Sequence, residues 1–334
     1  MEPIHVNFLL RSITLRRDTD LEARALQTLP LRQLGTDGPR IPAIGFGLME
    51  KGLQILGRAL ELGETFWDTA DIYHGNEKLI GKWFKRTGNR QRIFLTSKGA
   101  IKMEGMEFKG IDSSEKYLKV ECVESLARLE LEYIDLDYAH RLNPHTPVKD
   151  TMCGLVEGRI KHINLCEVSS TALRRTVKIA PVAAVQIEYS SFVREVETDT
   201  PQNLAATSES WASLLSDTSQ GTEVRGKNLP RFNEKNMEAN AKFAARFKEL
   251  ADKKHCSARQ LVLARLLAQG NIVFPIPGTR KVNYLEDNLK ALNVELTREE
   301  VAEVKHFLEH NEMQGYRSAE IAKHFAFTDT KTEI

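Results

Sequence analysis

The chain has 334 residues, of which 47 are basic and 46 acidic, giving a net charge of +1. This balance offers no electrostatic reason to expect nucleic acid or an anionic membrane as a partner. Hydrophobic residues make up 41% and charged residues 28% of the chain, as in ordinary globular proteins. No apolar run approaches the roughly 18 residues of a membrane span. The length suits one large α/β barrel or two smaller domains.

The cysteine pattern indicates a reduced, cytoplasmic setting without a metal site. The four cysteines, Cys122, Cys153, Cys166 and Cys256, form no CxxC pair and have no metal-ligand spacing. Residues 1–28 contain no secretory hydrophobic segment and are interpreted as a weakly ordered extension.

Along the rest of the chain, short apolar runs alternate with amphipathic helical stretches, as in a parallel sheet covered by helices. Ser114 and Ser257 are predicted helix N-caps, Gly270 ends the second of these helices, and Lys235–Lys254 is a longer helix. The predicted strands are Ala43–Gly47, Thr65–Thr69, Ile93–Ser97, Tyr133–Ala139, Ile160–Leu165, Ala184–Tyr189 and Ile272–Ile276.

A closed (β/α)8 barrel needs one more strand between Tyr189 and Ile272. The stretch Glu195–Asn228 is instead polar and rich in Ser and Thr, and only Asn203–Leu215 could hold a short element. The prediction is therefore a (β/α)8 TIM barrel that could be incomplete around its seventh strand.

A doubly wound dinucleotide-binding fold is the other α/β candidate. Its glycine fingerprint is missing, because Glu50 stands where a third glycine should follow Gly45 and Gly47. The barrel remains the favoured architecture.

Four titratable residues follow predicted strands, and in a barrel the carboxyl ends of the strands face the active site. Asp68 and Tyr73 follow the second strand, Lys98 the third and His140 the fourth. Such a set suits carbonyl reduction, in which the arriving hydride leaves an alkoxide that needs a proton. Tyr73 would supply it as general acid, with Lys98 lowering its pKa, Asp68 neutralising Lys98 and His140 orienting the carbonyl.

Each of these residues also has a structural interpretation. Lys98 and Asp68 could simply form an ion pair between neighbouring strands. His140 could be an ordinary packing residue, and Tyr73 an ordinary loop aromatic.

The last predicted strand leads into a candidate phosphate site. It ends in Gly278, Thr279 and Arg280, just before a helix that begins near Val282. The loops after strands seven and eight, with a helix N-terminus, are the usual phosphate site of a barrel. The alternative is an ordinary capped helix with a solvated Arg280. One helical turn later come Asp287 and Asn288, which could form hydrogen bonds with adenine or ribose.

Taken together, these motifs resemble those of the aldo-keto reductases, and most closely the fungal and plant branch with pyridoxal reductase-like and auxin-induced-like members. The similar region is 29–325, leaving 326–334 as a tail. The motifs are WDTADIY, NEKLIGKWF, IFLTSK, YIDLDYAHR, VQIEYSSF and IPGTRKVNYLEDNL.

The resemblance implies a (β/α)8 barrel that binds NADPH across its C-terminal face and acts on a small carbonyl substrate. The family's catalytic tetrad falls on Asp68, Tyr73, Lys98 and His140. Its nicotinamide contacts fall on Cys166, Glu167 and Gln186. Its 2′-phosphate and adenine contacts fall on Gly278, Thr279, Arg280, Asp287 and Asn288.

The chain departs from the family pattern in several places. Met49 runs almost directly into the first helix, and the region before the fifth strand is shortened. Cys166 replaces the usual serine. Nothing in 198–227 matches the family's seventh strand, although Trp211 could replace the tyrosine that stacks on the nicotinamide.

These departures leave three hypotheses open. The first is an active NADPH-dependent oxidoreductase. The second is a catalytically impaired barrel that acts as a binding or regulatory protein. The third is a mis-spliced gene model that does not fold stably. A strand within 200–228 that closes the barrel would favour the first hypothesis.

Overall fold

The computed structural model describes residues 28–35, 37–48, 53–73, 75–105, 107–156, 159–191, 193–194, 197, 212–216, 230, 233–311, 313–316 and 325–332. The expected N-terminal extension up to residue 27, Met49 and Trp211 lie outside these described residues.

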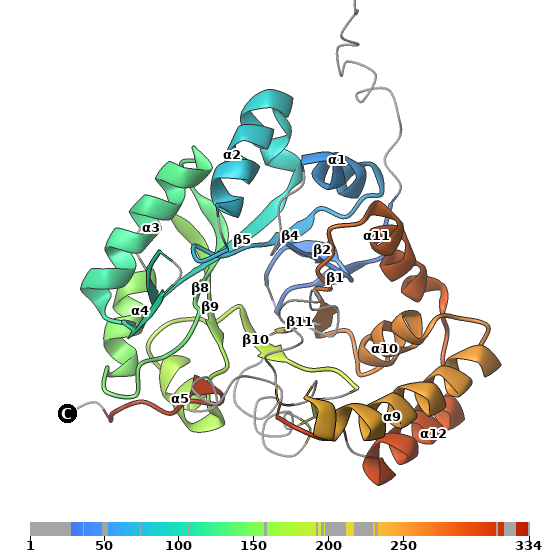
Figure 1. The fold of residues 1–334 in the computed structure, drawn as a ribbon. Coiled ribbons are helices and arrows are strands. Elements are labelled where there is room, and N and C mark those ends of the chain that lie inside the picture. The colour runs from blue at the N-terminus through green and yellow to red at the C-terminus, as the bar shows by residue number, and fades with distance from the viewer. Residues whose placement is uncertain are drawn as a thin grey trace, which may run out of the picture.

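Eight parallel strands form one sheet in the order β12-β11-β10-β9-β8-β5-β4-β3, and Figure 1 shows the helices around its outside. The strands are β3 (Phe46–Gly47), β4 (Phe66–Asp68), β5 (Phe94–Gly99), β8 (Ile134–Ala139), β9 (Ile160–Cys166), β10 (Ala184–Glu188), β11 (Ala212–Ser216) and β12 (Val273–Pro275). The seven strands expected from the sequence are all present, and the prediction of a (β/α)8 barrel is confirmed.

Backbone hydrogen bonds join the first and last strands of this sheet. The amide of Gly45 donates to the carbonyl of Pro275 at 2.9 Å, and that of Gly47 donates to the carbonyl of Pro277 at 3.2 Å. A parallel bridge also pairs Gly47 with Gly278. The two edges of the sheet therefore meet, and the barrel closes.

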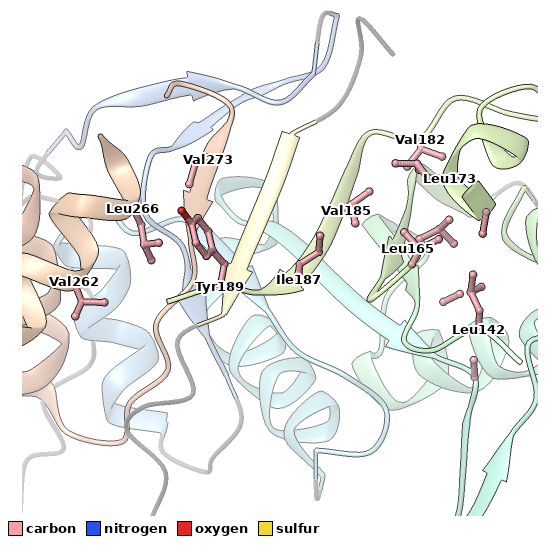
Figure 2. Packing of buried hydrophobic residues seen from close by; sticks show 14 of the residues in the cluster. Leu142, Leu165, Leu173, Val182, Val185, Ile187, Tyr189, Val262, Leu266 and Val273 are labelled. Carbon is pink, nitrogen blue, oxygen red and sulfur yellow. The ribbon is translucent and has the colours of Figure 1, made fainter. Parts of the chain in front are cut away.

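The seventh place in the barrel is occupied by β11, where the sequence showed no convincing strand. Leu214 pairs in parallel register with Gln186 of β10 and with Phe274 of β12, and Figure 2 shows β11 in yellow between these two strands. This strand overlaps Asn203–Leu215, the one stretch in which the sequence allowed a short element, and its ladder hydrogen bonds come from the backbone, which a segment without a continuous apolar run also provides. The flanking residues 198–211 and 217–229 lie outside the described chain.

The helices begin and end close to the predicted positions. The hydroxyl of Ser114 accepts the amide of Tyr117 at the start of α3, and Ser257 forms a capping box with Gln260 at the start of α10, so both predicted N-caps are confirmed. The helices are α1 (Leu53–Glu61), α2 (Asn76–Thr87), α3 (Glu115–Leu129), α4 (Val148–Leu155), α5 (Ser170–Thr176), α9 (Glu234–Lys253), α10 (Ala258–Leu267), α11 (Val282–Leu289) and α12 (Arg298–His310). Two short 3-10 helices are η2 (Asn89–Arg92) and η4 (Lys290–Asn293). Since β3 ends at Gly47 and α1 begins at Leu53, the first loop is short, as expected.

Two antiparallel hairpins were not predicted. One consists of β1 (Leu31–Gln33) and β2 (Arg40–Pro42), and the other consists of β6 (Ile101–Glu104) and β7 (Glu107–Ile111), which follow β5. The first hairpin is attached to the barrel by Arg32, whose guanidinium donates to three backbone carbonyls at the end of α10 and in β12.

The hydrophobic core lies both inside the barrel and between the sheet and the helices. Phe66, Leu136 and Phe274 belong to the cluster inside the barrel. The largest cluster joins β9 and β10 to helices on the outside, and Figure 2 shows Leu165 and Val185 within it. This packing holds the strand ends in fixed relative positions. No helix in the described part of the chain is long and apolar enough to cross a membrane.

Candidate active site

A buried ion pair occupies the carboxyl ends of β4 and β5. The ammonium of Lys98 donates to Asp68 Oδ2 at 2.5 Å and to the carbonyl of Thr69 at 2.7 Å. Thr96 donates its hydroxyl to Asp68 Oδ1 at 2.6 Å. Lys98 is 1% exposed and Asp68 4% exposed. Since an unpaired buried charge is very costly, each of these charges depends on the other.

Tyr73 and His140 complete the cluster that the sequence predicted. Their rings meet edge to face, with centroids 6.0 Å apart, and the ammonium of Lys98 lies 5.2 Å from the centroid of the Tyr73 ring. Tyr73 comes from the loop before α2 and His140 from the end of β8. The structure therefore brings all four predicted catalytic positions together at one end of the barrel.

The protonation states differ in one respect from the prediction. Burial raises the pKa of Tyr73, and the positive charge of Lys98 only partly opposes this rise. The expected net lowering of the phenol pKa is therefore wrong, because removal from water outweighs the nearby cation. Burial lowers the pKa of His140 well below its usual value, so its imidazole is neutral. Burial opposes the charge of Lys98, but Asp68 and other neighbours hold its pKa above the usual value.

Cys166 and Gln186 connect the ion pair to β9 and β10. The thiol of Cys166 donates to Gln186 Oε1 at 3.4 Å, and Gln186 Nε2 donates to Asp68 Oδ2 at 3.3 Å. Burial raises the pKa of Cys166 to about 12, which keeps it a neutral thiol. An amide ligand could thus exchange hydrogen bonds with a side-chain amide and a weak thiol donor.

Glu167 follows Cys166, and one oxygen of its carboxylate already accepts a hydrogen bond from the backbone. Its Oε1 accepts the amide of Glu188 at 2.8 Å, and its own amide donates to the carbonyl of Gln186 at 2.9 Å. Glu167 therefore aligns the ends of β9 and β10, and its role beside the nicotinamide stays a prediction.

The predicted phosphate site lies where the barrel closes. A Cβ on Gly278 would approach the carbonyl oxygen of Gly47 to 3.0 Å, so a glycine here favours the close contact between the first and last strands. Thr279 Oγ1 accepts the amide of Lys281 at 3.2 Å, just before α11. Arg280 is exposed beside them. Thr279, Arg280 and the start of α11 thus follow one another directly after the carboxyl end of β12.

Asp287 and Asn288 differ in their availability. Asp287 accepts from Gln260 at 2.6 Å and from Arg259 at 2.9 Å, so its carboxylate joins α11 to the start of α10. Asn288 is 1% exposed, and among the described residues its amide nitrogen and oxygen have no hydrogen-bond partner. A buried amide without partners is costly. It fits a ligand that offers both a donor and an acceptor, as adenine does.

Two other residues at this end were missed by the sequence analysis. Thr96 binds Asp68 and lies two residues before Lys98 on the same strand, so strand alternation could have identified it. Arg141 directly follows His140 and donates to the carbonyl of that residue at 2.6 Å. Its position next to a predicted strand-end residue was the available signal.

Comparisons with known proteins agree with this geometry. Residues 43–309 match the model of the aldo/keto reductase family. The chain is 34% identical to aldo-keto reductase str7 of Strobilurus tenacellus, covering 87% of this chain and 95% of that protein. It is also 34% identical to aldo-keto reductase yakc, whose name specifies NADP(+), of Schizosaccharomyces pombe, covering 91% and 98%. The fold is similar to that of aldo-keto reductase AKR11C1 from Bacillus halodurans in its holo form, with a TM-score of 0.70 and 24% identity over 87% of this chain and 99% of that one.

Proposed function

Since the chain belongs to the aldo/keto reductase family and is an NADP-dependent oxidoreductase, we propose that it reduces an aldehyde or ketone to an alcohol with Tyr73 as general acid. The observation that carries this proposal is the buried Lys98–Asp68 pair beside the Tyr73 ring. A buried cation next to a phenol stabilises the phenolate that forms when the proton leaves.

When bound, NADPH would supply the hydride for the carbonyl carbon. As negative charge develops on the carbonyl oxygen, Tyr73 donates its phenolic proton to that oxygen. Lys98 stabilises the resulting phenolate, and Asp68 keeps Lys98 in place. The neutral imidazole of His140 donates a hydrogen bond that orients the carbonyl. Because burial raises the pKa of Tyr73, its proton is retained at neutral pH until the alkoxide forms.

The cofactor would be held at two places on the same face. Gln186 and Cys166 would bind the nicotinamide amide. Thr279 and Arg280 would bind the 2′-phosphate, since a guanidinium forms paired hydrogen bonds with phosphate oxygens, and Asn288 would bind adenine. The remaining cofactor positions would act indirectly, by shaping the backbone around these groups: Glu167, Gly278 and Asp287.

The binding-protein and mis-splicing hypotheses depended on a barrel that lacks its seventh strand. With β11 in the seventh place and the tetrad assembled, no observation on the described residues favours them.

Tyr73→Phe tests the proposal. We expect the kcat for reduction of an aromatic aldehyde to fall by about 100-fold or more, since general acids contribute about that much. Affinity for NADPH should stay nearly unchanged, because the phenol ring remains. Steady-state turnover and calorimetric NADPH titration measure the two effects.

A suitable control is Tyr133→Phe, which removes a hydroxyl that forms an exposed hydrogen bond to Gln91 at 3.2 Å and leaves the half-buried ring in place. This variant should retain full activity. Equal turnover by the wild type and Tyr73→Phe would exclude Tyr73 as the acid.

A further inference from the structure

A positively charged side chain stands next to the proposed catalytic residues and takes no part in the mechanism above. Arg141 follows His140 directly and is half-buried. We propose that Arg141 binds a carboxylate carried by the carbonyl substrate, so that the enzyme prefers aldehydes or ketones with an acidic group. This inference rests on the proposed carbonyl reduction, because it names the substrate class of that same site.

Arg141 differs from other arginines in the barrel in what it pairs with. Arg90, Arg128 and Arg265 each form an ion pair with a carboxylate. Within the described part of the chain, Arg141 pairs with no carboxylate, and its one hydrogen bond goes from Nη1 to the carbonyl of His140. A guanidinium has five N–H donors, so the edge formed by Nε and Nη2 is left for a ligand. That edge matches the two oxygens of a carboxylate.

The positive charge of Arg141 affects the pKa values of the groups at the site. After burial, Arg141 is the next cause of the lowered pKa of His140, ahead of Lys98. It also opposes the rise that burial causes in the pKa of Tyr73 and of Cys166. Since Asp68 already neutralises Lys98, Arg141 supplies the uncompensated positive charge near these three residues.

The segment that carries Arg141 is held in place. Asn143 donates its amide to the hydroxyl of Ser113 at 3.1 Å and its side-chain nitrogen to the carbonyl of Ile111 at 2.8 Å. The carbonyl of Pro144 accepts the amide of Lys331 at 2.8 Å. A guanidinium on a fixed backbone loses less conformational freedom when a ligand binds, which favours selective recognition.

A matched pair of substrates isolates the carboxylate. Succinic semialdehyde carries one, and its methyl ester is a neutral analogue with the same aldehyde. We expect the wild type to have a KM for the acid about tenfold or more below that for the ester, the usual size of a charged hydrogen-bonded pair. In Arg141→Ala, the KM for the acid should rise to that for the ester, while the KM for the ester stays unchanged. Arg141→Lys should restore part of the difference between the two KM values. Arg92→Ala, an exposed arginine at the amino end of β5, should change nothing.

Other outcomes would overturn the assignment. An equal fall in kcat for both substrates in Arg141→Ala, with the KM difference between acid and ester unchanged, would mean that Arg141 acts on His140 and not on the carboxylate. A loss of NADPH affinity would mean that it binds the cofactor. Equal KM values for acid and ester in the wild type would show that no carboxylate is recognised.

A binding measurement separates this inference from the proposed function. The NADP(+) complex is titrated with γ-hydroxybutyrate and with the neutral γ-hydroxybutyramide. If the wild type reduces neither aldehyde, the proposed function fails. Preferential binding of the acid that is lost in Arg141→Ala would still support the carboxylate site, and equal binding of acid and amide would refute it.

Discussion

Two buried carboxyl groups flank β4 and have opposite surroundings. Asp68 receives hydrogen bonds from Lys98, Thr96 and Gln186. Glu64 is fully buried, and neither of its carboxyl oxygens has a partner among the described residues. Burial raises the pKa of Glu64 well above its usual value. The first carboxylate therefore serves the site, whereas the second affects only the stability of the fold.

Glu64 makes the stability of the protein depend on pH. The folded state keeps its carboxyl protonated, whereas the unfolded state releases that proton above about pH 4.3. The free energy of unfolding therefore falls as pH rises from there towards the raised pKa, by up to about 1.4 kcal/mol per pH unit. Glu64→Gln should remove this contribution and be the more stable protein at neutral pH. Urea denaturation across this pH range measures it, and identical pH dependence in both proteins would contradict the assignment.

At the scale of single residues, the sequence identified which residues form the site better than it identified their protonation states. Asp68, Lys98 and His140 were found because residues at strand ends of a barrel converge, a property of topology alone. The net direction of the Tyr73 pKa shift was missed, because it depends on how far the ring is removed from water. The pairing of Asp287 with Arg259 was missed as well, since it joins side chains of two helices that are separated by β12 along the chain.

Among the elements, the β1–β2 hairpin is joined to the barrel by Ile41, which is buried in the cluster inside the barrel, and by the side chain of Arg32. Arg32 donates to the carbonyls of Gly270, Val273 and Leu267 at 2.9, 2.7 and 3.1 Å. These carbonyls include the end of α10, where a cation also favours the helix dipole. Arg32 therefore joins the hairpin to α10 and β12.

Arg32→Ala should destabilise the protein by about 1–3 kcal/mol, because three partly buried carbonyls would lose their donor. Chemical denaturation measures the change. Arg40→Ala provides the control, since Arg40 is exposed and makes one bond of 3.3 Å to the carbonyl of Leu31. Equal effects of the two substitutions would show that the hairpin is not held by Arg32.

Strand prediction succeeded where apolar runs were continuous and failed at β11. Buried parallel strands read as apolar runs, and the seven predicted strands have this pattern. The segment of β11 follows a long polar stretch, so the sequence indicated only that a short element could lie within Asn203–Leu215 and did not fix a strand there. Its place is set by β10 and β12 on either side, which is tertiary information that a local pattern does not contain.

At the scale of the whole molecule, the contact that closes the barrel also positions the proposed cofactor site. Gly47 and Gly278 allow the first and last strands to meet. The same contact places Thr279 and Arg280 beside the start of α11. A chain that closes its barrel should therefore also form the phosphate site.

Calorimetric titration of NADPH and NADH into the wild type and Arg280→Ala tests this account most directly. We predict saturable binding of NADPH that is tighter than that of NADH, and a loss in Arg280→Ala that is larger for NADPH, because the guanidinium contacts a phosphate that NADH lacks. Failure of the folded wild-type protein to bind NADPH would contradict the account, as would an equal loss for both cofactors in the variant.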